Sequence, residues 1–168
     1  MLEKLNFDVV VVGGGPAGAS AARIAAENDC TVALIEKEKE IAETVRTSGV
    51  TWISDIKHFG IPDECYNPIK KFSFRSPKNS VTISDEVAKA AVLDVRKTYR
   101  FLAKRAQNAG ARIFVSTNVS DIIKNSKGKC AGVIAKSYEK KIQFNGKVII
   151  DASGFASVVA KELGYVKQ

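Results

Sequence analysis

Residues 9–18 read VVVVGGGPAG, an apolar run that passes directly into a glycine turn. Four β-branched residues in succession favour a strand that is buried on both faces, as in the centre of a parallel sheet. Gly13, Gly15 and Gly18 have the G-x-G-x-x-G spacing of dinucleotide-binding turns. The first allows a tight turn, the second lets a pyrophosphate approach the backbone, and the third lets the next helix pack closely on the strand. The segment therefore predicts a strand, a phosphate-binding turn and a helix.

The predicted helix begins at Pro16, because proline lacks only an N–H that has no partner in the first helical turn. The N–H groups and the positive dipole at this end of a helix favour an anion. Glu36 ends the next apolar run, residues 31–35, where an acidic side chain accepts hydrogen bonds from a ribose hydroxyl. The alternative is an ordinary strand–turn–helix with a surface glutamate, but the strand before, the helix after and the acid together favour a dinucleotide site.

The length and composition indicate one soluble globular domain. The chain has 168 residues, of which 45% are hydrophobic and 26% charged, so it can form a sizeable core and disorder is not indicated. No apolar run approaches the roughly 20 residues that span a bilayer, and residues 1–6 lack the features of a signal peptide. We therefore expect a cytoplasmic protein. Its three cysteines are widely spaced, without a C-x-x-C pair, and are expected to be reduced structural thiols, with no metal site.

The net charge of +8 at neutral pH suggests either nucleic acid or an anionic membrane as a partner. The basic residues are scattered, and no run of like charge stands out. A solvated basic surface is therefore favoured over nucleic-acid binding, and an anionic lipid surface fits better. We expect no nucleic-acid partner and a cytoplasmic location that extends to the membrane periphery.

The rest of the chain predicts further elements of an α/β fold. The region of about residues 60–93 predicts an excursion of short strands, with Tyr66, Phe72 and Phe74 as its packing residues. The other elements that we predict are helices over residues 16–28, 50–59, 94–108 and 157–163, strands over residues 113–115 and 147–151, and an antiparallel β-meander over residues 119–124, 131–137 and 140–144.

This order of elements, which ends in Asp-Ala-Ser-Gly at residues 151–154, resembles the FAD domain of glutathione-reductase-type flavoproteins over nearly the whole chain. Within that group the chain is most similar to the geranylgeranyl reductase family, whose members saturate isoprenoid chains with reduced FAD. The resemblance implies an α/β fold: a Rossmann-like three-layer FAD/NAD(P)-binding domain with a parallel central sheet and an antiparallel β-meander. It also implies FAD as the cofactor, hydride or electron transfer as the chemistry, and an unsaturated isoprenoid lipid as the substrate.

The family pattern carries over to individual residues of the glycine turn and its neighbours. Glu36 matches the residue that binds the adenosine ribose, and Val119 matches one whose backbone touches the adenine. Asp151 and Gly154 match the motif that closes the FAD domain, in which Asp151 can be chiefly structural. The residues that the resemblance places at the FAD pyrophosphate are Gly13, Gly15, Pro16, Ala17 and Gly18.

Two further segments match the family at basic residues. Arg46, Thr47 and Ser48 fall where such reductases have a Val-Arg-Cys-Gly type loop near the flavin, which makes them cofactor contacts. Many members have a cysteine at the position of Thr47. Arg96 matches an arginine that reaches the cofactor's phosphates, a role suited to its fork of donors. The alternative for both arginines is an ordinary exposed cation.

The resemblance also implies what lies beyond this chain. In the family a third flavin motif, Gly-Asp-Ala, and the substrate-binding sheet follow after residue 168, so we expect residues 1–168 to be the FAD-binding domain of a longer oxidoreductase. No general acid or base is assigned, and the catalytic residues are unknown. The alternatives are a halogenase, hydroxylase or cyclase of the same superfamily, a non-catalytic nucleotide-binding fragment, and an NAD-binding Rossmann protein.

Overall fold

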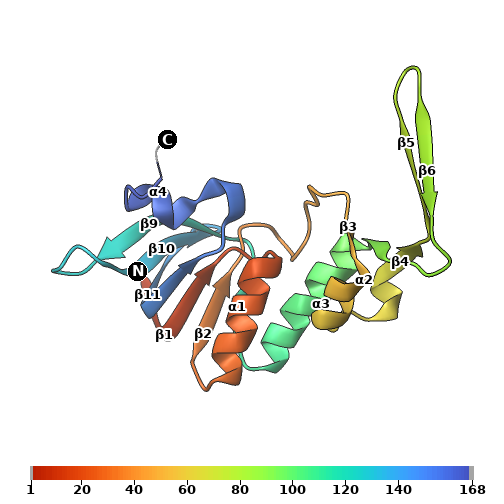
Figure 1. The fold of residues 1–168 in the computed structure, drawn as a ribbon. Coiled ribbons are helices and arrows are strands. Elements are labelled where there is room, and N and C mark those ends of the chain that lie inside the picture. The colour runs from red at the N-terminus through yellow and green to blue at the C-terminus, as the bar shows by residue number, and fades with distance from the viewer. Residues whose placement is uncertain (1, 167–168) are drawn as a thin grey trace. The chain divides into compact units, whose positions relative to one another are not determined.

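The computed structural model describes residues 2–166, which divide into two compact units (Figure 1). The first unit comprises the chain up to Thr44 and from Tyr99 onward, and the second comprises Val45–Thr98. No helix in residues 2–166 is long and apolar enough to cross a membrane.

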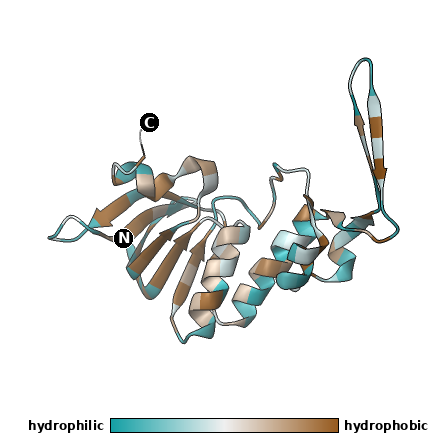
Figure 2. Cartoon of the chain, viewed as in Figure 1, coloured by the Kyte–Doolittle hydropathy of each residue, from teal (hydrophilic) through white to brown (hydrophobic). Residues whose placement is uncertain are grey.

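The first unit is built on a six-stranded sheet in the order β8-β2-β1-β11-β10-β9. Strand β1 is parallel to both β2 and β11, and β2 is parallel to β8, whereas β9, β10 and β11 form an antiparallel meander. The predicted combination of a parallel centre and a meander is therefore confirmed. Figure 2 shows these strands mostly in the brown of hydrophobic residues. The strands are β1 (Glu3–Val12), β2 (Val32–Ile35), β8 (Arg112–Phe114), β9 (Thr117–Lys124), β10 (Cys130–Ser137) and β11 (Lys140–Asp151).

Residues 140–151 form one continuous strand, where the sequence predicted two, and β9 begins two residues before the predicted 119. The reason is the length of β1, which pairs with β11 from Glu3 opposite Ile142 to Val12 opposite Asp151. A single long partner strand supports both the meander half and the parallel half of β11. The meander and the parallel strands are therefore parts of one sheet.

The alternating residues of β1 bury two different faces of the sheet. Val9 and Val11 face a cluster with Ala22 of helix α1 (Pro16–Glu27) and Ala106 of helix α3 (Val95–Asn108). Val10 and Val12 belong to the opposite cluster, which is formed with the meander and with helix α4 (Val158–Glu162). Small alanines let the helices approach the sheet closely, which suits the predicted alanine-rich helix. The result is the predicted three layers.

The second unit contains a three-stranded antiparallel sheet, in the order β3-β7-β4, and a separate two-stranded hairpin, β5–β6. The predicted helix over residues 50–59 begins only at Ile53, because residues 50–52 pair with Ala90–Val92 as a strand. Phe74 is 59% exposed, so it does not pack as the sequence predicted. The elements are β3 (Val50–Trp52), α2 (Ile53–His58), a 3₁₀ turn η1 (Asp63–Cys65), β4 (Tyr66–Ile69), β5 (Lys71–Arg75), β6 (Ser80–Ser84) and β7 (Ala90–Leu93).

Candidate cofactor-binding site

A cleft of about 590 Å³ lies in the first unit, at the carboxyl ends of β1, β2 and β11. Ligands of open α/β sheets bind at this edge, because parallel neighbours bring their carboxyl ends together there. The residues predicted from sequence that line the cleft are Gly13, Gly15, Pro16, Ala17, Glu36, Val119 and Gly154. Residues far apart in the chain thus meet at one edge of the sheet.

Two glycines of the turn are required by close backbone contacts. Gly13 has a φ of 107°, and a Cβ there would overlap the carbonyl group of Ala152 on the neighbouring β11 side. A Cβ at Gly18 would overlap the carbonyl oxygen of Gly13. The Gly13 N–H donates to the carbonyl oxygen of Ile35 at 2.8 Å, which ties the turn to β2. Strand β1, its turn and helix α1 therefore come as close as only glycine permits.

Gly15 differs from its neighbours, because a Cβ at this position would have no protein atom within 4 Å. Its φ of −68° and ψ of −178° are accessible to any residue, so backbone strain does not require glycine here. Gly15 is the N-cap of α1; no side chain caps this end, and the first turn carries no acidic residue. The first N–H groups of a helix have no partner within the helix. The geometry therefore leaves room and donors for an anion beside Gly15.

Glu36 is held at the end of β2 by backbone donors. The Gly14 N–H donates to its Oε2 at 2.7 Å, and the Glu38 N–H donates to its Oε1 at 2.9 Å. Its own carbonyl oxygen accepts the Thr117 N–H at 2.9 Å, which connects β2 to the start of β9. The half-buried carboxylate thus lines the cleft in a fixed position, and the free lone pairs of its oxygens can accept from a ligand hydroxyl.

Asp151 ends β11 but does not itself line the cleft, because its carboxylate caps helix α4. Its Oδ2 accepts the N–H groups of Val159 and Ala160 at 2.9 and 2.8 Å, and its Oδ1 accepts the Ser153 hydroxyl. Partial burial raises the pKa of Asp151, but these hydrogen bonds outweigh it and hold the pKa below its ordinary value. Asp151 therefore shapes the Ala152–Gly154 wall of the cleft.

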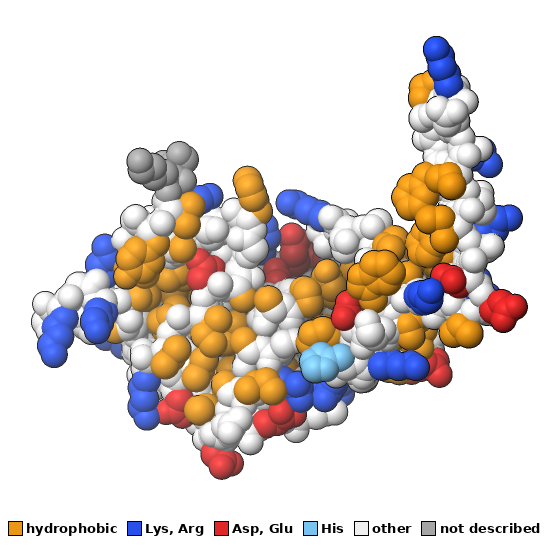
Figure 3. All heavy atoms as spheres, in the orientation of Figure 1, with side chains coloured by type: hydrophobic (Ala, Val, Ile, Leu, Met, Phe, Trp, Pro, Cys, Tyr) orange, Lys and Arg blue, Asp and Glu red, His pale blue; other side chains and the backbone are white. Residues whose placement is uncertain are grey.

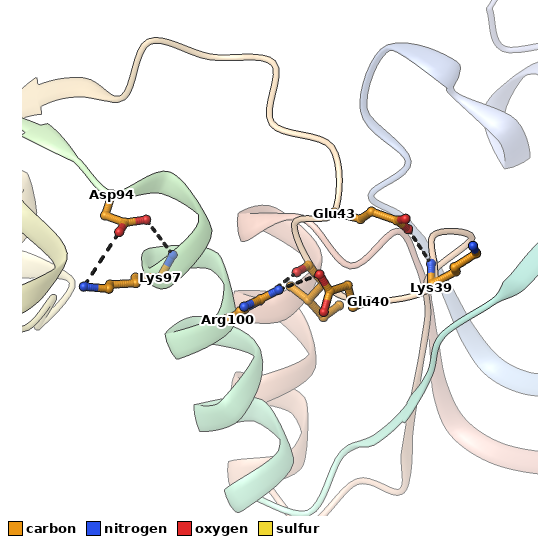
Figure 4. Close-up of polar contacts among 7 residues, drawn as sticks. Lys39, Glu40, Glu43, Asp94, Lys97 and Arg100 are labelled. Atoms are coloured by element: carbon orange, nitrogen blue, oxygen red, sulfur yellow. Dashed lines mark hydrogen bonds and ion pairs between the residues drawn. The ribbon is translucent and has the colours of Figure 1, made fainter.

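Four predicted residues belong to the second unit. Arg46, Thr47 and Ser48 are exposed in the segment before β3, where the Thr47 hydroxyl oxygen accepts the Gly49 N–H at 3.3 Å. Arg96 is exposed in the first turn of α3, which Asp94 caps through the Lys97 N–H at 3.0 Å (Figure 4). Contacts of these four residues with the cofactor stay predictions.

The structure adds residues that the sequence did not indicate. Lys37, Thr117 and Asn118 also line the cleft, beside Glu36 and Val119. They lie just outside the predicted strands, where hydrophobic periodicity gives no signal. The segment that follows Lys37 is anchored to α3, because Arg100 Nη2 pairs with Glu40 Oε1 at 2.6 Å (Figure 4).

Residues 8–162 match the sequence model of the FAD dependent oxidoreductase family. The chain belongs to this family. A digeranylgeranylglycerophospholipid reductase of Methanocaldococcus jannaschii is 34% identical over 169 residues, which cover 97% of the chain and 42% of the reductase. A solved structure of a geranylgeranyl bacteriochlorophyll reductase-like protein from Thermoplasma acidophilum superposes with a TM-score of 0.82 at 30% identity, over 90% of the chain and 40% of that protein. The family implies FAD, in agreement with the cleft.

The chain spans less than half the length of these two proteins and corresponds to their N-terminal portion. A second kind of relative is much shorter. An uncharacterised protein encoded in the nifH2 5′ region of Methanosarcina barkeri is 31% identical over 177 residues, which cover 98% of this chain and 91% of that protein. The same sequence region therefore occurs both within long reductases and in a protein of about this length.

Proposed function

We propose that residues 1–168 bind FAD as the cofactor-binding part of a geranylgeranyl-reductase-type oxidoreductase. The observation that carries the proposal is the uncapped start of α1, where Gly15 leaves open space within a cleft that Glu36 also lines. A pyrophosphate needs both the donors and the space, since its oxygens approach the backbone directly. In this proposal Gly13, Gly18 and Asp151 act indirectly, by fixing the turn and the opposite wall.

The chain's residues bind and orient the cofactor, and they supply no assigned acid or base. Bound FAD supplies hydride or electron transfer at its ring system. The N–H groups of the first turn of α1 hold the negative charge of the pyrophosphate, and Glu36 accepts from the ribose hydroxyls. Val119 offers its backbone to the adenine. Arg46, Thr47, Ser48 and Arg96 are the proposed contacts from the second unit.

The proposed substrate is an unsaturated isoprenoid chain of a lipid. The proposal rests on the similarity to the reductases, one of which is named for digeranylgeranylglycerophospholipid. A cytoplasmic location at the membrane periphery fits such a substrate, and the net charge of +8 would favour an anionic surface. Sedimentation with anionic and neutral vesicles tests the location, and equal binding to both would contradict it.

A titration of the purified chain with FAD, followed by visible absorbance and flavin fluorescence, tests the cofactor proposal. We expect saturable binding of FAD, and we expect an excess of NAD, which does not absorb in the visible, to displace the bound FAD only weakly. Absence of saturable FAD binding would overturn the proposal. The complex is then photoreduced anaerobically, and digeranylgeranylglycerophospholipid is added. This step tests whether the reduced flavin bound to this chain alone transfers electrons to the lipid.

A flavin-binding module without catalysis is a second candidate, favoured by the Methanosarcina barkeri relative, of which the matched region covers 91%. The photoreduction experiment separates the two. Bound flavin that stays reduced after the lipid is added favours the module, whereas reoxidation with saturation of the lipid favours the reductase.

A further inference from the structure

The hairpin of β10 and β11 has two like charges in direct opposition. The strand register places Lys136 opposite Lys141, and the adjacent pair, Ala135 and Ile142, is buried in the core. Because successive side chains of a strand point to opposite faces, both lysines lie on the outer face of the meander. Like charges directly opposite each other destabilise a sheet. An anion bound at this face would therefore stabilise the pair.

A third lysine joins the same face from β1. Lys4 is opposite Gln143, which is two residues from Lys141 and so points to the same side of the sheet. Lys4, Lys136 and Lys141 are exposed, and none of them forms an ion pair within the described part of the chain. Residues 136–141 contain three lysines and one glutamate, a net charge of +2. We call Lys4, Lys136 and Lys141 the basic face.

The turn of this hairpin presents an aromatic side chain to solvent. Tyr138 is 82% exposed and has a φ of 52°. Two-residue hairpin turns favour glycine, asparagine or aspartate at positions of positive φ, because a bulky side chain is strained there. The chain therefore gains little burial from a tyrosine in a strained position. A tyrosine ring has an apolar body and a polar hydroxyl, which suits the boundary between water and a membrane.

We propose that the basic face and Tyr138 form the surface through which this chain docks on an anionic phospholipid membrane. The inference deepens the proposed function and rests on its location at the membrane periphery. The lysine ammonium groups would lie against the lipid phosphates, and the Tyr138 ring would enter the headgroup region. Figure 3 shows further Lys and Arg side chains around the meander, at the left of the view, which would add to the attraction.

The chemistry of this surface favours a membrane over nucleic acid. Its cations are lysines, which act as compact point charges, whereas the planar fork of arginine is the donor best suited to the individual phosphates of nucleic acid. Tyr138 is the one aromatic residue between Phe114 and Phe144, so the hairpin has no series of rings on which successive bases could stack. An anionic lipid surface requires neither feature, because it attracts lysines through their summed charge.

Co-sedimentation of the full chain with vesicles tests the proposal. We expect binding to vesicles of equal parts phosphatidylcholine and phosphatidylglycerol that weakens as salt is added, and much weaker binding to phosphatidylcholine alone. The double variant Lys136→Gln/Lys141→Gln should reduce the affinity for the anionic vesicles about tenfold or more, because each lysine near the surface contributes to the attraction. The matched control Lys127→Gln/Lys129→Gln removes the same charge from the exposed β9–β10 turn and should have a much smaller effect.

Two further measurements separate a loss of docking from a loss of folding. The Lys136→Gln/Lys141→Gln variant should unfold at the same temperature as the original chain or higher, because the opposed charges are gone. Tryptophan fluorescence then reports on the hairpin turn itself. In a Trp52→Phe background, which removes the one native tryptophan, Tyr138→Trp should shift its emission to shorter wavelength when anionic vesicles are added. Ser126→Trp, in the β9–β10 turn, is the control and should show no shift.

Four results would overturn the inference: no preference of the original chain for anionic vesicles, an equal loss of affinity with both double variants, an emission shift at Ser126→Trp but not at Tyr138→Trp, or binding of duplex DNA that Lys136→Gln/Lys141→Gln removes while vesicle binding is kept. FAD titration of the same samples distinguishes the two proposals. Vesicle binding through the basic face without FAD binding would contradict the cofactor proposal alone. FAD binding with unchanged vesicle affinity in Lys136→Gln/Lys141→Gln would contradict the docking alone.

Discussion

Two turns at the carboxyl ends of neighbouring parallel strands illustrate how similar sequences produce different helix ends. Strand β1 leads through Gly13–Gly15 into α1, and β11 leads through Ala152–Ser157 into α4, with Val12 opposite Asp151 in the sheet. The first helix begins without a side-chain cap. The second has its N–H groups occupied by the Asp151 carboxylate. One turn therefore offers donors to an anion, and the other supplies its own anion and forms a wall.

The largest effect on unfolding free energy and on FAD binding is expected from Gly13→Ala, which disrupts the first turn. The new Cβ would overlap the Ala152 carbonyl, and a φ of 107° strains any L-residue with a side chain. We expect a loss of more than about 3 kcal/mol of unfolding free energy and no measurable FAD binding. Urea denaturation and FAD titration check this result. An alanine variant with the stability of the original chain would contradict the proposed contact.

The second turn is broken by Asp151→Ala. Removing the carboxylate leaves the N–H groups of Val159 and Ala160 and the Ser153 hydroxyl without their acceptor. We expect a loss of about 2 kcal/mol in unfolding free energy, with a smaller effect on FAD affinity than Gly13→Ala. Asp121→Ala, at an exposed aspartate on β9, is the control and should cost about 0.5 kcal/mol or less. Equal losses of unfolding free energy in both variants would contradict the capping role of Asp151.

The same carboxylate predicts a pH dependence. The pKa of Asp151 is lower in the folded chain than in the unfolded chain. Its contribution to the unfolding free energy is therefore complete above the unfolded pKa of about 3.9, and it is lost as the pH falls through the folded pKa. The difference in unfolding free energy between the original chain and Asp151→Asn should therefore be constant near neutral pH and shrink below about pH 4. Denaturation at a series of pH values measures it. A free-energy difference that grows as the pH falls would show that folding raises the pKa of Asp151 instead of lowering it.

A smaller effect on FAD affinity than that of Gly13→Ala is expected from Glu36→Gln, which tests the role of the first turn in binding. The amide retains the shape of the side chain but loses the negative charge. That charge strengthens the hydrogen bonds from the Gly14 and Glu38 N–H groups and, in our proposal, those from the ribose hydroxyls. We expect FAD affinity to fall about tenfold, as for the loss of a charged hydrogen bond. Glu38→Gln is the neighbouring control and should bind FAD normally. Unchanged FAD affinity in Glu36→Gln would show that Glu36 does not bind the ribose.

Local features of the fold could be predicted from sequence, whereas two of its long-range strand pairings could not. The strand at Val9–Val12 and the close contacts of Gly13 and Gly18 follow from β-branching and from the absence of a side chain. The strand at Val50–Trp52 was missed, because its pairing partner lies 40 residues away at Ala90–Val92. The same limit hid the continuous β11, which only the pairing with β1 reveals.

The candidate site divides in the same way. The glycines and Glu36 were predicted because their roles follow from a local motif. Lys37, Thr117 and Asn118 were not, since they line the cleft only through the way β9 begins beside the end of β2. Asp151 and its partners Val159 and Ala160 are separated by eight and nine residues, so the cap appears only once α4 is folded back onto β11.

The most direct test of the account is FAD affinity and unfolding free energy measured together for Gly15→Ala. The position has ordinary backbone angles and open space, so the apo chain should stay folded and lose at most about 1 kcal/mol, the cost of alanine in place of glycine at an N-cap. The methyl group would enter the space that our proposal assigns to the pyrophosphate, so FAD affinity should fall about tenfold or more. Unchanged FAD affinity in a stable Gly15→Ala chain would contradict a pyrophosphate site at the start of α1.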